Sequence, residues 1–118
     1  MHPTFGTLKG FDIHTGLAYA DGDEELYREV LLMFLEQLTT EFAHLPNQLR
    51  DGSNETLSRK VHTLKGSASS VGAIHIETVV RDIEQHLKHD ENTLSDSLIN
   101  QLQTSLKTAI DELSALKT

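Results

Sequence analysis

Apolar residues recur at intervals of three and four along most of the chain, which is the spacing of one buried face on an α-helix. The longest such stripe consists of Tyr27, Leu31, Phe34, Leu38, Phe42, Leu45 and Leu49. Asp21 and Glu24 have the spacing of a capping box, which predicts the start of this helix. Pro46 lacks a backbone donor, so we expect a kink or an early end there, before Asp51 and Gly52 break the helix.

A short helix before this stripe and three long helices after it complete the pattern. Asp12 can cap the short helix, and Ser53 can cap the helix that follows the long stripe. That helix ends at Gly72, where a left-handed residue belongs, and Thr93 with Asp96 predicts the start of the last helix. The apolar positions are Ile13, Leu17 and Ala18; Leu57, Val61, Leu64, Ala68 and Val71; Ile76, Val79, Val80, Ile83 and Leu87; and Leu94, Leu98, Leu102, Leu106, Ile110 and Leu113.

These helices predict an all-α fold. No run of β-branched residues bounded by turns indicates a strand, and the connections are short, so neighbouring helices should run antiparallel. The expected architecture is an up-down antiparallel four-helix bundle with a short extra helix at the N-terminus. The length of 118 residues predicts one domain, 1–118.

One polar face of the third helix, the one that Ser53 can cap, carries candidate chemistry. At about 100° per residue, His62 points away from the apolar positions and shares its face with Ser58, Lys65, Gly66 and Ser69. A glycine inside a helix costs roughly 1 kcal/mol relative to alanine, and no bend is needed at this position. Gly66 therefore predicts that another molecule approaches the imidazole. Lys65, one turn from His62, could balance the charge of an anion on the ring.

Composition excludes several classes of protein. The chain has no cysteine, so it holds neither disulfides nor thiolate metal sites. No stretch approaches the roughly 20 apolar residues of a membrane span. A formal net charge of -8 argues against binding to nucleic acids and to anionic lipids.

The segment from His62 to Ala68, His-Thr-Leu-Lys-Gly-Ser-Ala, is followed by Val71-Gly72-Ala73. Together they closely resemble the signature of histidine-phosphotransfer domains. The segment from Gly16-Leu17 through Gly22 to Tyr27 also resembles the start of that family. The resemblance covers most of the chain, about residues 11–116.

This resemblance implies roles for individual residues. His62 is the phosphoacceptor, Lys65 neighbours the phosphoryl group, and Gly66 keeps the ring accessible. Glu84 falls where the family often has a Glu or Gln that holds the other ring nitrogen, and Gln85 is the neighbouring candidate because sequence alone does not fix the helix phase. Such a side chain fixes the tautomer and leaves the outer nitrogen free to attack.

The resemblance also implies the function and the partners. We expect a phosphocarrier without kinase activity of its own, which takes a phosphoryl group from the aspartyl phosphate of a receiver domain and passes it to, or back from, another receiver domain. It needs no cofactor, because the receiver holds the Mg²⁺. We expect a cytoplasmic monomer that contacts neither nucleic acid nor membrane. A free-standing carrier and the C-terminal domain of a hybrid sensor histidine kinase both fit the sequence.

Three alternatives compete with this hypothesis. In the dimerisation module of a sensor histidine kinase an acidic residue normally follows the histidine, whereas Thr63 follows here, and no glycine-rich ATP-binding region is present. A metal-binding bundle could use His86 and His89, but no His-Glu-x-x-His motif or pair of Glu-x-x-His helices occurs. A plain helical adaptor explains the apolar stripes and leaves the polar face around His62 unexplained.

Overall fold

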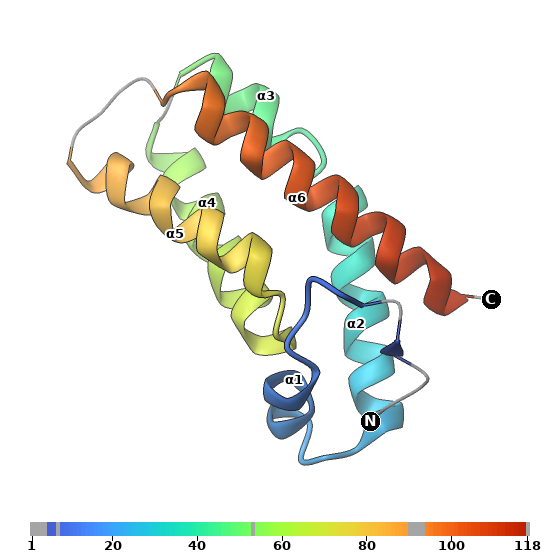
Figure 1. The fold of residues 1–118 in the computed structure, drawn as a ribbon. Coiled ribbons are helices and arrows are strands. Elements are labelled where there is room, and N and C mark those ends of the chain that lie inside the picture. The colour runs from blue at the N-terminus through green and yellow to red at the C-terminus, as the bar shows by residue number, and fades with distance from the viewer. Residues whose placement is uncertain (1–4, 7, 53, 90–93, 118) are drawn as a thin grey trace.

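The computed structural model describes residues 5, 6, 8–52, 54–89 and 94–117. Within these residues the chain forms six α-helices and a final 3₁₀ turn, with no strand (Figure 1). The elements are α1 Ile13–Tyr19, α2 Glu24–Thr39, α3 Leu45–Arg50, α4 Glu55–Val71, α5 Ile74–Lys88, α6 Asp96–Ser114 and η2 Ala115–Lys117. The predicted all-α class is confirmed.

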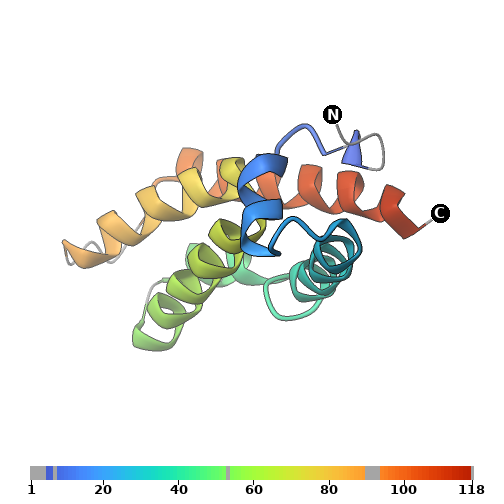
Figure 2. The same cartoon turned by 90° about the horizontal axis from the view of Figure 1, so that it is seen from below.

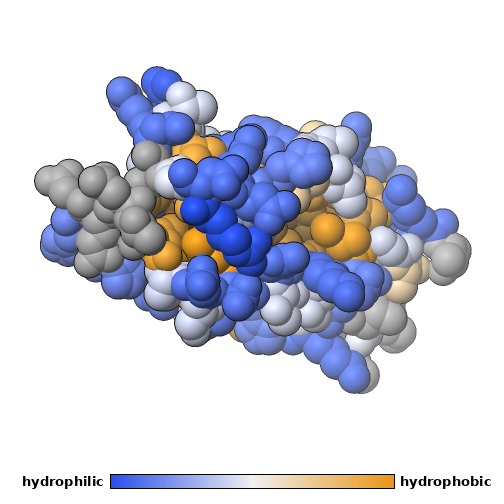
Figure 3. Space-filling view, turned by 90° about the horizontal axis from the view of Figure 1, so that it is seen from above, coloured by the Kyte–Doolittle hydropathy of each residue, from blue (hydrophilic) through white to orange (hydrophobic). Residues whose placement is uncertain are grey.

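The four long helices form the bundle. α2 packs against α4 and α6, and α5 packs against the same two helices, so each long helix has two long neighbours. α4 and α5 run antiparallel as a hairpin, and α1 lies against α4 and α2 (Figures 1 and 2). The body is elongated, 42 × 24 × 20 Å. On the face seen from above, apolar side chains show between hydrophilic ones (Figure 3).

The longest apolar stripe belongs to two helices, so the prediction of one helix interrupted at Pro46 is wrong. α2 ends at Thr39, and Pro46 lies in the first turn of the separate helix α3. A proline is tolerated there because a first-turn N–H has no partner within the helix. Phe42, between the two helices, remains fully buried. The apolar spacing therefore continues through a segment whose backbone has left the helix.

The residue that caps α1 was predicted correctly, and the one that caps α2 was not. Asp12 caps α1 through a 3.1 Å bond that its carboxylate accepts from the backbone N–H of Thr15. α2 is capped by Asp23, which accepts from Leu26 at 3.1 Å, and the predicted start at Asp21 is wrong. Asp21 has a φ of 55° and belongs to the turn before the helix.

The capping residues of α4 and α6 also differ from those predicted. Asn54 caps α4, and its side chain accepts from the backbone N–H of Leu57 at 2.9 Å. Ser95 caps α6 in the same way at 3.2 Å. These findings correct the capping roles predicted for Ser53 and Thr93, which lie outside the described residues. Several cap-forming residues stand side by side at both places, and sequence spacing alone does not choose between them.

The turn between α4 and α5 is built around Gly72, as predicted. Its φ is 76°, and its carbonyl accepts a 2.7 Å hydrogen bond from the backbone N–H of Asp12. A Cβ at this position would clash with the Asp12 carbonyl oxygen. The hydroxyl of Tyr27 donates to the carbonyl of Val71 at 2.8 Å, and burial raises the pKa of Tyr27 to about 12, so the donor stays protonated. Asp12 and Tyr27 thereby stabilise the turn between α4 and α5.

Substitution of Gly72 by alanine should destabilise the fold more than the same change at Gly22. Both glycines have a φ of 76°, so each variant bears left-handed strain of about 1–2 kcal/mol. Only at Gly72 does a Cβ meet another atom, because nothing lies within 4 Å of one at Gly22. Urea unfolding of the two variants measures the difference. Equal losses of unfolding free energy would show that the contact with Asp12 is unimportant.

Candidate functional site

His62 lies in the middle of α4 and faces outward. Its side chain is 70% exposed, whereas Val61 and Leu64 beside it are buried in the core. The imidazole therefore points away from the core, as the helical periodicity predicts. An exposed histidine can meet another macromolecule without any movement of the bundle.

A single carboxylate from α5 holds this histidine. Glu84 Oε2 lies 2.6 Å from His62 Nδ1, and Glu84 Oε1 lies 2.6 Å from Lys65 Nζ. Only 12% of the Glu84 side chain is exposed. Since an ionised carboxylate can only accept, we assign the ring proton to Nδ1, which leaves the lone pair of a neutral ring on Nε2.

Electrostatics keep Glu84 ionised. The hydrogen bond from Lys65 lowers the pKa of this carboxyl, the hydrogen bond from His62 lowers it further, and burial opposes both. Glu84 is the only buried charged residue in the described part of the chain. Gln85, the other candidate from sequence, is exposed. The structure thus brings together His62, Lys65 and Glu84 and leaves Gln85 outside the group.

Gly66 leaves open space one turn after His62. A Cβ built on Gly66 would meet nothing within 4 Å, whereas one on Gly16 would lie 2.5 Å from the Tyr27 ring. Internal packing therefore requires a glycine at position 16 and does not require one at position 66. The gap matters only to a molecule that approaches the imidazole from outside.

The α1–α2 side of the site includes two exposed apolar residues that sequence reasoning did not assign. Tyr19 is 67% exposed and Leu26 is 44% exposed. Both line a shallow cleft that also includes Ser70 of α4, about two turns beyond His62. Leu26 lies off the apolar stripe of its helix, which was the sequence signal for its exposure. Single exposed apolar residues are common on protein surfaces, so this signal does not identify an interface.

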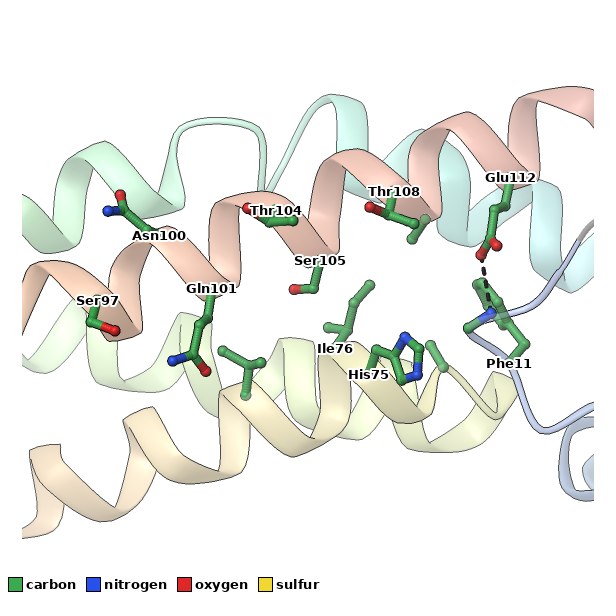
Figure 4. A pocket seen from close by; sticks show the side chains of 14 residues that line it. Phe11, His75, Ile76, Ser97, Asn100, Gln101, Thr104, Ser105, Thr108 and Glu112 are labelled. Atoms are coloured by element: carbon green, nitrogen blue, oxygen red, sulfur yellow. Dashed lines mark hydrogen bonds between the residues drawn. The ribbon is translucent and has the colours of Figure 1, made fainter.

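Another groove lies away from His62, which is not among its lining residues. It has a volume of about 740 Å³ and runs between α5 and α6. Uncharged polar side chains such as Gln101 and Thr104 line one wall, and His75 stands on the other (Figure 4). At about 100° per residue, His75 and Glu84 lie on opposite faces of α5. His62 instead stands on an open surface, which suits a protein partner better than an enclosed small molecule.

The comparison with protein families identifies the class of domain. The sequence model of the Hpt domain, the histidine-phosphotransfer domain, matches residues 29–116. This chain belongs to the Hpt domain family. Hpt domains are helical phosphocarriers that act in two-component phosphorelays, interact with receiver domains and have no kinase activity of their own.

The family match confirms the resemblance seen in the sequence. It begins within α2, so the similarity noted between Gly16 and Tyr27 lies outside the matched range. No curated protein and no solved structure matches the chain. Among the described residues, no helix is long and apolar enough to cross a membrane, and no group of three or more His, Cys, Asp or Glu residues could hold a metal ion.

The interactions of Glu84 should make stability depend on pH. Because the folded-state pKa of Glu84 is below its ordinary value of 4.5, its ionised form contributes to the unfolding free energy above that pH. The contribution is lost as the pH falls through the folded-state pKa. The difference in stability between the native protein and Glu84→Gln should therefore shrink as the pH is lowered from about 6 to about 3.

Urea unfolding across this pH range measures the difference, and exposed Glu41 provides a matched control. Glu41→Gln removes the same charge without disturbing a buried pair, so it should change stability little at any pH. A constant difference between the native protein and Glu84→Gln would contradict a stabilising role for the ionised carboxylate.

Proposed function

We propose that His62 is the phosphoacceptor of this Hpt domain and that Nε2 is the atom that forms the bond to phosphorus. The observation that carries this proposal is the position of the ring: it is 70% exposed, yet a buried carboxylate holds its Nδ1 at 2.6 Å. This arrangement supplies an accessible nucleophile with a fixed orientation and tautomer.

In the proposed reaction, the Nε2 lone pair attacks the phosphorus of an aspartyl phosphate on a receiver domain. The N–P bond forms as the P–O bond to the aspartate breaks, and the aspartate leaves as a carboxylate. The ring keeps its Nδ1 proton and becomes positively charged, and Glu84 balances that charge. Positioning and charge balance are the main contributions a protein can make to such a loose transition state.

Lys65 and Glu84 support this chemistry from one side of the ring. The 2.6 Å bond from Lys65 keeps Glu84 ionised and holds its second oxygen in place. Both residues therefore serve the orientation of His62. The chain needs no cofactor of its own, since the Mg²⁺ for the reaction belongs to the receiver.

The partner in this proposal is a receiver domain that supplies the pocket around the phosphoryl group. The exposed side chains of Tyr19 and Leu26, on the α1–α2 side of the site, would form part of its apolar contact. A specific protein interface of standard size covers about 800 Å² on each partner, or roughly 30 Å across, which can include these residues and His62. We propose a cytoplasmic monomer that exchanges phosphoryl groups in either direction, whether free-standing or within a hybrid kinase.

Incubation with a phosphorylated receiver should label the native protein and leave His62→Gln unlabelled. The label should be stable in base and lost in acid, as expected for phosphohistidine. ATP alone should give no label. Labelling of His62→Gln to the native level would contradict the assignment, and labelling by ATP alone would favour a kinase module.

Gly66→Ala should make the protein more stable and transfer slower. Alanine favours a helix interior by about 1 kcal/mol, and the added methyl group meets no atom of the chain. It would obstruct the incoming donor, and a small misplacement can slow a reaction by roughly ten- to a hundredfold. Unfolding and transfer rates measured on the same sample separate the two effects. An unchanged transfer rate would show that the open space has no role in transfer.

A further inference from the structure

The orientation of the His62 ring decides where a phosphoryl group would stand. Nδ1 is held toward α5 by Glu84, and Nε2 lies on the opposite edge of the ring. Taking His62 as zero, Lys65 lies at about -60° around α4, on the side that faces Glu84. Gly66 and Arg59 lie at about +40° and +60°, on the other side. The Nε2 edge of the ring is therefore turned toward the side of α4 that carries Gly66 and Arg59.

The basic side chains on the two sides of α4 differ in whether an acidic partner already balances their charge. The ammonium of Lys65 lies 2.6 Å from a Glu84 oxygen, so its charge is already balanced. Arg59 is exposed, and none of the ion pairs among the described residues involves it. α4 contains three basic side chains and one acidic side chain in a protein of net charge -8. Arg59 is therefore an available cation close to an acceptor that must take up about two negative charges.

Arg59 is also within reach of the ring. It precedes His62 by three residues, and side chains at this spacing are neighbours on a helix surface. Helical side chains lean toward the N-terminus, so the His62 ring lies over the turn that contains Arg59. A guanidinium can donate two parallel hydrogen bonds to the oxygens of one phosphoryl group.

We propose that Arg59 binds the phosphoryl group on Nε2 of His62 and stabilises its charge during transfer. This inference rests on the proposed function of His62. It makes Arg59 a catalytic residue that the sequence motif beginning at His62 does not include. Lys65 orients the nucleophile through Glu84 on one side of the ring, and Arg59 meets the transferred group on the other.

Phosphoramidate as the phosphoryl donor tests this role without a receiver. The Nε2–P bond forms as the P–N bond of phosphoramidate breaks, and ammonia leaves. Since no receiver is present, a docking contact cannot affect the rate. Loss of one hydrogen bond to a charged group should slow labelling of Arg59→Gln by roughly tenfold or more. Arg59→Lys, which keeps the charge, should recover part of the rate.

Lys107→Gln provides the matched control, since it removes an exposed positive charge from α6 and should react at the native rate. Circular dichroism establishes that each variant is folded, and Arg59→Lys keeps the test valid if Arg59→Gln is not. A native rate for Arg59→Gln with phosphoramidate would overturn the proposal, even if transfer from a receiver were slower. Labelling of His62→Gln would instead overturn the proposed function itself.

Discussion

The site depends on one carboxylate, Glu84, whose two oxygens bind two side chains of the neighbouring helix. A buried charge is strongly unfavourable unless it is paired and hydrogen-bonded, and His62 and Lys65 satisfy one oxygen each at 2.6 Å. Loss of either partner would leave part of this charge unbalanced. The cost of burying the carboxylate therefore fixes the positions of the histidine and the lysine together.

The rest of the fold sets the register of α5 against α4, so that the Glu84 carboxylate lies beside His62 and Lys65. The hairpin between α4 and α5 turns at Gly72, so this turn determines which residues of the two helices lie side by side. Asp12 and Tyr27 bind the backbone around the turn, which ties the first part of the chain to the geometry of the site. The surface around His62 stays open to a partner protein.

The sequence predicted the helices more accurately than the ends of the helices. Apolar spacing predicted the helices of the bundle, and Gly72 predicted the hairpin turn. Each of these features depends on the type of residue at particular positions, which the sequence shows directly. The separation of α2 from α3 was missed because Phe42 keeps the apolar spacing where the backbone is not helical. The choice between Glu84 and Gln85 depends on the relative rotation of two packed helices, which neither helix specifies alone.

The most direct measurement of the role of Glu84 is the ¹⁵N NMR spectrum of the His62 ring before and after phosphorylation. With Glu84 holding Nδ1, the free protein should show a proton on Nδ1, and the phosphorylated protein should show coupling between phosphorus and Nε2. A free ring protonated on Nε2, or phosphorus coupled to Nδ1, would contradict the arrangement described for this site.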